Sequence, residues 1–179
     1  KGTTEHDFQQ LYPETEYKIY AIGIDELTGE FNTEVIFSEV ITTPAKGVSE
    51  TYIEVTFDKY FDGSALAQKY PQEFGDAAGY AVVPLKVTKH GDVAQFWYDV
   101  YSDDLSDTTY PTDLDLIIDL QINGIANKEY TYAYCDYSTI LTLASFCKDS
   151  EDNDSAVTRN VFRVLDSGVS PVDEFEFFE

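Results

Sequence analysis

The chain is short of basic residues. Its 179 residues include 11 Lys and Arg against 34 Asp and Glu, which gives a formal net charge of −23. Nucleic-acid phosphates are bound by basic residues that displace counterions, and anionic membrane surfaces attract basic segments for a similar reason. The charge therefore excludes nucleic acid as the expected partner and argues against docking on an anionic membrane.

The sequence also lacks methionine and any run of 18 apolar residues. Without such a run, no transmembrane segment is expected. Because position 1 is Lys1 and no charged-then-apolar leader follows it, we expect an excised fragment or a matured product whose secretion signal has been removed. The acidic, Tyr-rich and Thr-rich composition favours a secreted or cell-surface protein.

Residues that commonly carry catalysis are scarce. His6 and His90 are the only histidines, and His90 lies beside Gly91, where a turn is expected. The sequence contains no G-x-S-x-G, H-E-x-x-H or Gly-rich phosphate-binding pattern. We therefore predict no catalytic residues, no enzymatic activity and no cofactor.

What is abundant favours strands. Fourteen Tyr and twelve Phe accompany many Thr and Val residues, and these types prefer pleated sheets. Period-two alternation predicts a hairpin of residues 17–23 and 35–40 around Gly29, and a second hairpin of residues 81–87 and 96–100.

One helix is expected from Thr112 to Gly124, on the edge of a sheet. Thr112 or Asp113 suits its N-cap and Gly124 its C-terminal end. The apolar residues proposed to share one face of this helix are Leu114, Ile117, Ile118 and Ile122. A shorter helical turn capped by Ser64 is expected before Pro71.

An internal repeat relates the two ends of the chain. A shift of 124 residues (132 − 8 = 124) preserves the apolar phase of a strand, a turn and a second strand. The aligned pairs include Phe8 with Tyr132, Leu11 with Cys135, Tyr17 with Leu141, Ile19 with Leu143, and Val40 with Val164.

The stretch Leu11-Tyr12-Pro13-Glu14-Thr15-Glu16-Tyr17 resembles the L-x-P-x-T-x-Y signature of fibronectin type III modules. The resemblance implies that the Tyr17 hydroxyl hydrogen-bonds back across a corner between strands. The second copy keeps Thr139 but has Leu141 in place of the tyrosine, so it resembles a divergent immunoglobulin-like or fibronectin-like sandwich. Similar modules occur in secreted and lipid-anchored surface proteins of Gram-negative gut bacteria.

The fold expected from this resemblance is mostly β, with tandem immunoglobulin-like or fibronectin III-like sandwich modules. Residues 1–46 would supply only the end of a module, whereas 47–179 would supply a whole module with a short helical insertion. The truncated module would leave an apolar face bare, formed by Phe8, Leu11, Ile19, Val35 and Phe37. Burial of such side chains is worth roughly 1.5–3 kcal/mol each. We therefore expect this face to pack on the second module or on another chain, including by self-association.

Two groups of acidic residues are candidate ionic or catalytic sites. Asp149, Glu151 and Asn153 place oxygen ligands at alternate positions, as in the first half of a calcium loop, but Asp154 stands where the turn wants Gly. A solvated acidic loop between the last two strands is the preferred interpretation. Asp115 and Asp119 share a helix face, and surface acids explain them more simply than a catalytic pair.

Aromatic residues offer the other candidate site. Trp97 and Tyr101 alternate with Phe96, Tyr98 and Val100, so one of the two sets faces outward. If the Trp97 set is exposed, Trp97 and Tyr101 could stack on a sugar, although packing against the 112–124 helix is favoured. The stripe of Tyr130, Tyr132 and Tyr134 is expected to point into the core, as Phe8 does in the first copy.

Cys135 and Cys147 are too far apart along the expected strands to form a disulfide. Both align with inward positions of the first copy, so buried and unreactive thiols are expected. Together these observations predict a non-catalytic extracellular or cell-surface module that acts as a spacer, an adhesion domain or a binding domain. A carbohydrate-binding module of a glycan-utilisation system is the alternative.

Overall fold

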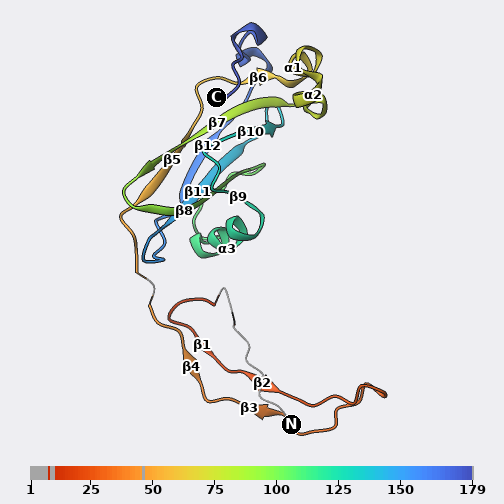
Figure 1. Ribbon diagram of the computed structural model, residues 1–179, viewed down its shortest axis with the longest axis vertical. Coiled ribbons are helices and arrows are strands. Elements are labelled where there is room, and N and C mark those ends of the chain that lie inside the picture. Colours follow the sequence, from red (N-terminus) through yellow and green to blue (C-terminus); the bar gives the residue numbers. More distant parts are fainter. Residues whose placement is uncertain (1–7, 9–10, 46, 179) are drawn as a thin grey trace. The chain divides into compact units, whose positions relative to one another are not determined.

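The computed structural model describes residues 8, 11–45 and 47–178, and His6 therefore lies outside the described residues. The chain forms two compact units, Lys1–Gly47 and Val48–Glu179, drawn in Figure 1. The division lies one residue after the expected boundary between residues 46 and 47. Strands dominate both units, so the chain is β-rich.

The first unit is a long, irregular hairpin. Strand β1 (Glu16–Tyr17) pairs with β4 (Ile41–Thr42), and β2 (Tyr20–Ala21) pairs with β3 (Ile36–Phe37), both antiparallel. At the tip, Gly29 has a φ of 73° and its N–H donates to the Asp25 carbonyl at 2.8 Å. Glycine adopts this left-handed conformation without a steric penalty. The first predicted hairpin is therefore confirmed.

The second unit contains two four-stranded antiparallel sheets. In the first sheet the order is β10-β7-β5, with β6 also paired to β7; in the second it is β12-β11-β8-β9. The strands of the first sheet are β5 (Tyr52–Thr56), β6 (Phe61–Asp62), β7 (Ala81–His90) and β10 (Tyr130–Cys135). The strands of the second are β8 (Val93–Tyr101), β9 (Ile125–Ala126), β11 (Leu141–Asp149) and β12 (Thr158–Phe162).

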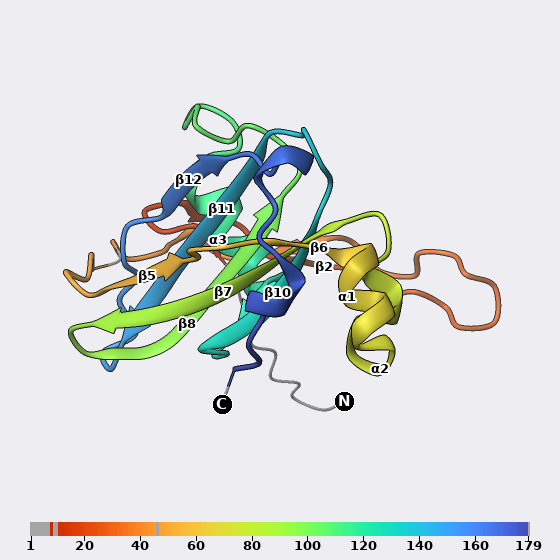
Figure 2. The ribbon, with the colours of Figure 1, turned by 90° about the horizontal axis from the view of Figure 1, so that it is seen from above.

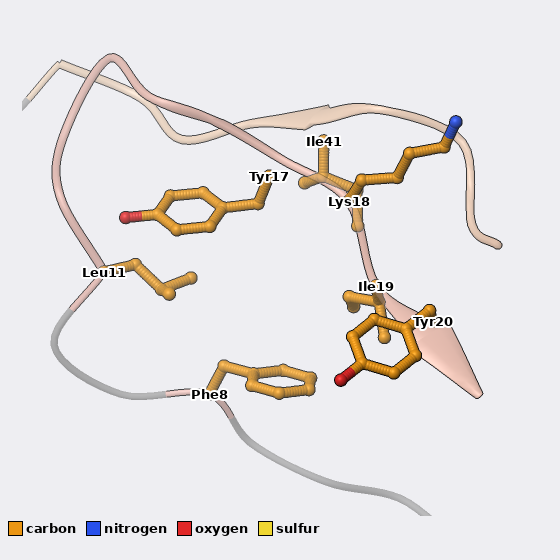
Figure 3. Close-up of a pocket in the computed structure, with 7 residues that line it drawn as sticks. All are labelled: Phe8, Leu11, Tyr17, Lys18, Ile19, Tyr20 and Ile41. Atoms are coloured by element: carbon orange, nitrogen blue, oxygen red, sulfur yellow. The ribbon is translucent and has the colours of Figure 1, made fainter. Parts of the chain in front are cut away.

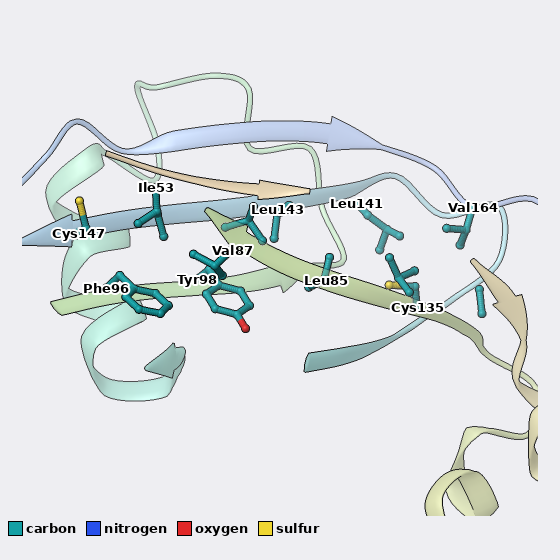
Figure 4. Close-up of a cluster of buried hydrophobic side chains, with 13 residues drawn as sticks. Ile53, Leu85, Val87, Phe96, Tyr98, Cys135, Leu141, Leu143, Cys147 and Val164 are labelled. Atoms are coloured by element: carbon teal, nitrogen blue, oxygen red, sulfur yellow. The ribbon is translucent and has the colours of Figure 1, made fainter. Parts of the chain in front are cut away.

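One apolar core joins the two sheets. Side chains of β5 and β7, such as Ile53 and Leu85, contact those of β8 and β11, such as Tyr98 and Leu143 (Figure 4). Each of these four is at most 3% exposed. The Tyr98 hydroxyl, which burial would leave without water, donates to the Lys128 carbonyl at 2.9 Å.

The expected second hairpin, over residues 81–100, is wrong. Strands β7 and β8 follow each other with a turn at Gly91, but β7 pairs only with strands of the first sheet and β8 only with strands of the second. Val83 and Leu85 on β7 therefore face Phe96 and Tyr98 on β8 across the core. Both segments are strands with one buried face, as their alternation predicts, but alternation does not identify the neighbouring strand.

Helices cover the outer faces of both sheets. Helices α1 (Gly63–Lys69) and α2 (Pro71–Phe74), a 3-10 turn (Gly75–Ala77) and the C-terminal segment cover the first sheet. Figures 1 and 2 show α1 and α2 beside β6. Asp62, rather than Ser64, caps α1, because its carboxylate accepts the Ala65 N–H at 2.7 Å. The C-terminal segment contains two 3-10 turns, Asp166–Gly168 and Val172–Glu174.

Helix α3 (Asp113–Asn123) covers the second sheet. Its capping box is formed by Thr112 and Asp115, and the expected bounds are confirmed. The expected apolar face is wrong in part. Ile117 packs against the cluster below the helix, but Leu116 and Leu120 are its buried residues and Ile122 is 61% exposed. The helix also lies on the face of β8 and β11 rather than on a sheet edge. Apolar residues surround this helix almost evenly, so their spacing did not select one face.

The internal repeat recurs in the backbone. Glu14 and Ser138, which the 124-residue shift aligns, both have positive φ, at 50° and 62°. In each copy the next residue is a threonine whose hydroxyl donates to the carbonyl two residues before it, at 2.9 Å for Thr15 and 3.4 Å for Thr139. An antiparallel hairpin follows each corner. The expected recurrence of a corner and a hairpin is thus confirmed.

Both cysteines are free and buried, as expected. Cys135 ends β10, Cys147 lies on β11, and each belongs to the core between the sheets.

Candidate functional site

Trp97 and Tyr101, the candidate sugar-stacking residues, lie beneath α3. The Trp97 ring stacks on Phe146 with centroids 5.0 Å apart and planes 10° apart. The Tyr101 hydroxyl donates to Asp119 Oδ2 on α3 at 2.6 Å. Both side chains are half-buried against the cluster that contains Leu116 and Leu120. The structure thus brings the two residues together as packing residues of the sheet and helix, and glycan binding by them stays a prediction.

Asp99 is a half-buried acid in the same contact between β8 and α3. Asp99 lies on β8 between Trp97 and Tyr101, and burial together with nearby Asp119 raises the pKa of its carboxyl. Burial and the hydrogen bond to Asp119 likewise raise the pKa of Tyr101 above its usual value. Asp115 behaves differently, because hydrogen bonds from Thr112 lower its pKa at the helix cap. Asp115 and Asp119 thus have separate partners.

The acidic loop folds on its own backbone. Asp149 Oδ1 accepts the N–H groups of Glu151 at 3.0 Å and Asn153 at 2.9 Å, while Oδ2 accepts from the Asn153 side chain at 3.2 Å. These bonds lower the pKa of Asp149. Among the residues that the structure describes, no group of three or more His, Cys, Asp or Glu side chains is arranged to hold a metal ion.

The tyrosine stripe on β10 faces outward from the core between the sheets. Tyr132 packs in the outer cluster with Phe74 and Phe175, and its ring stacks on Phe178 with centroids 4.9 Å apart. Tyr130 and Tyr134 are each 43% exposed. The expectation that this stripe points into the sandwich core is therefore wrong, because the C-terminal segment supplies an apolar cover on the other face.

His90 ends β7 and packs at the surface. Its ring stacks on Tyr52 with centroids 4.3 Å apart, and Nε2 lies 3.8 Å from Glu54 Oε2 on the neighbouring strand.

The most distinctive surface belongs to the first unit. Its hairpin carries a hollow of about 320 Å³, open to solvent, which we call the hairpin hollow (Figure 3). The residues that line it are Phe8, Leu11, Tyr17, Lys18, Ile19, Tyr20 and Ile41. Large apolar side chains here are solvent-accessible, with Leu11 at 42% and Ile19 at 38% exposure. Contiguous exposed apolar surfaces of this kind are typical of interaction sites and are uncommon on the remaining surface of soluble proteins.

The corner residues hold one wall of this hollow. The Tyr17 hydroxyl accepts the Tyr12 N–H at 2.7 Å, which is the back-bond expected for Tyr17. The Thr43 hydroxyl accepts the Thr15 N–H at 3.0 Å and ties the corner to the returning strand. Hydrogen bonds from backbone N–H groups to side-chain hydroxyls therefore fix this wall of the hollow.

The expected bare face and the observed hollow overlap in part. Phe8, Leu11 and Ile19 line the hollow, whereas Val35 and Phe37 are exposed outside it. Phe37 instead contacts the ring of Tyr20, and the Lys18 ammonium lies above the Phe37 ring. The lining residues outside the expected face are Tyr17, Lys18, Tyr20 and Ile41. The antiparallel pairing of Tyr17 with Ile41 explains the last of them.

Comparison with protein-family models, with curated proteins and with solved structures gives no match for this chain. Within the part of the chain that the structure describes, no helix has the length and apolar character needed to cross a bilayer.

Proposed function

We propose that the chain is a non-catalytic part of an extracellular or cell-surface protein, in which it acts as a spacer, adhesion or binding module. The observation that carries this proposal is the recurrence of one corner and hairpin in two separate units. Many cell-surface proteins are built from β-sandwich modules of one architecture. Such modules hold binding loops and strand edges at a distance from their point of attachment.

The strand order of the second unit supports an immunoglobulin-like or fibronectin III-like module. In immunoglobulin domains, strands A, B and E share one sheet, strands C, F and G share the other, and C′ lies beside C in variable-type domains. If β5, β7, β8, β9, β10, β11 and β12 are assigned to A, B, C, C′, E, F and G, the two sheets have this composition, and β6 is an additional strand paired to β7. The Tyr17 back-bond supports the same relation for the first unit.

The proposal is tested by presenting the full chain, coupled to beads, to arrays of glycans and of purified surface proteins. We expect retention on protein and none on glycan, with or without calcium, and no turnover in screens for hydrolases. The matched variants are Trp97→Ala and Tyr110→Ala, since Trp97 lies beneath α3 whereas Tyr110 is 83% exposed in a loop.

Glycan binding that Trp97→Ala removes and Tyr110→Ala retains, in chains shown to be folded, would replace the adhesion proposal with a carbohydrate-binding module. Turnover of any substrate would overturn the non-catalytic assignment.

A further inference from the structure

The hairpin hollow has a covered counterpart in the second unit. The 124-residue shift aligns Leu11 with Cys135 and Ile19 with Leu143. Cys135 and Leu143 are each 2% exposed in the core between the sheets, whereas Leu11 and Ile19 are 42% and 38% exposed. Equivalent positions of the repeated corner and hairpin, which we call the repeated frame, are thus buried in the second unit and exposed in the first.

The second unit also shows which element completes this frame. Strand β8 pairs antiparallel along β11, from Tyr101 opposite Thr142 to Val93 opposite Asp149. This pairing places Phe96 and Tyr98 of β8 in the core, in the same cluster as Leu143. The strand beside β11 therefore supplies both hydrogen bonds and part of the apolar cover.

In the first unit the corresponding edge faces away from the hairpin. Among residues 8 and 11–45, β1 and β2 each pair with a single strand. The Ile19 and Gly23 carbonyls accept bonds from Ser38 and Asn32 across the hairpin, at 2.8 and 2.9 Å. Because backbone polar groups alternate in direction along a strand, those of Lys18, Tyr20 and Ile22 point to the opposite edge.

The net charge of the first unit indicates the chemistry of a partner, although the one charged residue that lines the hollow itself is Lys18. Residues 11–45 contain one basic residue, Lys18, against seven acids. The acids are Glu14, Glu16, Asp25, Glu26, Glu30, Glu34 and Glu39. A partner strand flanked by lysine or arginine would be attracted to this unit, whereas an acidic strand would be repelled.

We propose that the outer edge of residues 17–23 accepts an extended segment of a partner polypeptide as an antiparallel strand. Alternate apolar side chains of that segment lie over the hairpin hollow, and basic residues flank it. Strand addition of this kind draws its affinity from main-chain hydrogen bonds and its specificity from alternate side chains. The inference rests on the proposed binding function and deepens it by naming the chemistry of the partner.

The test uses the full chain and a fluorescein-labelled peptide that copies residues 93–101, with two lysines added at each end. This peptide reproduces β8, the strand that completes the frame in the second unit. Fluorescence anisotropy should show saturable binding with one peptide per chain. Hydrogen exchange should slow at the outward-facing amides of Lys18, Tyr20 and Ile22 when the peptide is bound.

Matched variants locate the site. Ile19→Asp, which places a charge in the hollow, should weaken binding at least tenfold. Leu27→Asp makes the same kind of change at the hairpin tip, where Leu27 is 97% exposed, and should alter affinity less than twofold. A peptide with proline at alternate positions cannot donate the ladder hydrogen bonds and should not bind, a control that does not depend on how the chain variants fold.

Several results would overturn the proposal: no binding of the β8 peptide, equal binding of the proline peptide, unchanged affinity of Ile19→Asp, or protection outside residues 18–22. A chain that sediments as a dimer with these amides already protected would place a second copy there instead. If the strand-addition proposal fails, the peptide affinities will show it. If the proposed function fails, the chain will show turnover of a substrate or glycan binding that depends on Trp97.

Discussion

At the scale of single residues, Asp99 shows how burial of a charged carboxylate destabilises the folded state. Its carboxyl lies between β8 and α3, where burial raises its pKa and the neighbouring Asp119 adds repulsion. One oxygen accepts the Val100 N–H at 2.8 Å. An ionised Asp99 therefore destabilises the folded state relative to the unfolded chain.

We predict that Asp99→Asn raises the free energy of unfolding at pH 7, because the amide retains an acceptor and removes the buried charge. The folded-state pKa of Asp99 is raised above its unfolded value of about 3.9. The ionised carboxylate therefore lowers the free energy of unfolding, and this loss reaches its full size at pH values above the folded-state pKa. The loss disappears as the pH falls through that pKa toward the unfolded value. Urea unfolding of both proteins between pH 4 and 8 should show a gain that shrinks with acidification.

Asp104 provides the control of opposite sign. Hydrogen bonds from Ser106 lower its pKa, so its charge favours the fold, and Asp104→Asn should lower stability at neutral pH. A gain from Asp99→Asn that is constant across the pH range would contradict the burial argument.

At the scale of elements, α3 shows that local capping residues determine where a helix begins and ends, whereas contacts with neighbouring strands determine which face is buried. Its ends follow local chemistry, since Thr112 and Asp115 close the capping box and Gly124 follows the last turn. Its buried face follows from contact with β8 and β11, where Ala144 and Phe146 meet Leu116 and Leu120.

Substitution on α3 should distinguish the two faces. Leu120→Ala removes a fully buried side chain and should cost about 2–5 kcal/mol of unfolding free energy. Ile122→Ala, at a position 61% exposed, should change stability by less than about 0.5 kcal/mol. Chemical denaturation monitored by far-ultraviolet circular dichroism measures both, and equal costs would contradict the assigned face.

At the scale of the whole molecule, the second unit has two sheets, each covered on its outer face, around one shared core. Cys135 and Cys147 come from different sheets and are 2% and 0% exposed in that core. Burial raises the pKa of the Cys135 thiol to about 12. Because the thiolate is the reactive species, a folded chain should protect this thiol.

Thiol titration should therefore report on the integrity of the sandwich. At pH 8, a disulfide reagent such as DTNB should modify no thiol of the native chain and both thiols in guanidinium chloride. Both should become reactive in the same unfolding transition that circular dichroism detects. Rapid reaction of one thiol under native conditions would mean that the core opens locally at one sheet.

Several features followed from the amino-acid sequence alone because their causes are local. The turn at Gly29, the cap at Thr112 and the corner at Glu14–Tyr17 each depend on residues a few positions apart. The repeat could be found because both copies need the same apolar phase to form the same corner.

Only the tertiary structure decided which strands are neighbours and what covers each face. Strands β7 and β8 show the alternation of a hairpin, yet they lie in opposite sheets because both bury alternate residues in one core. Tyr132 lies on the outer face of its strand, and the C-terminal segment, far away in the chain, covers it. The packing of Trp97 against α3, which is nearby in the chain, agrees with the expectation from the sequence. Alternation records that a face is buried, but the element that buries it is chosen by contacts between distant parts of the chain.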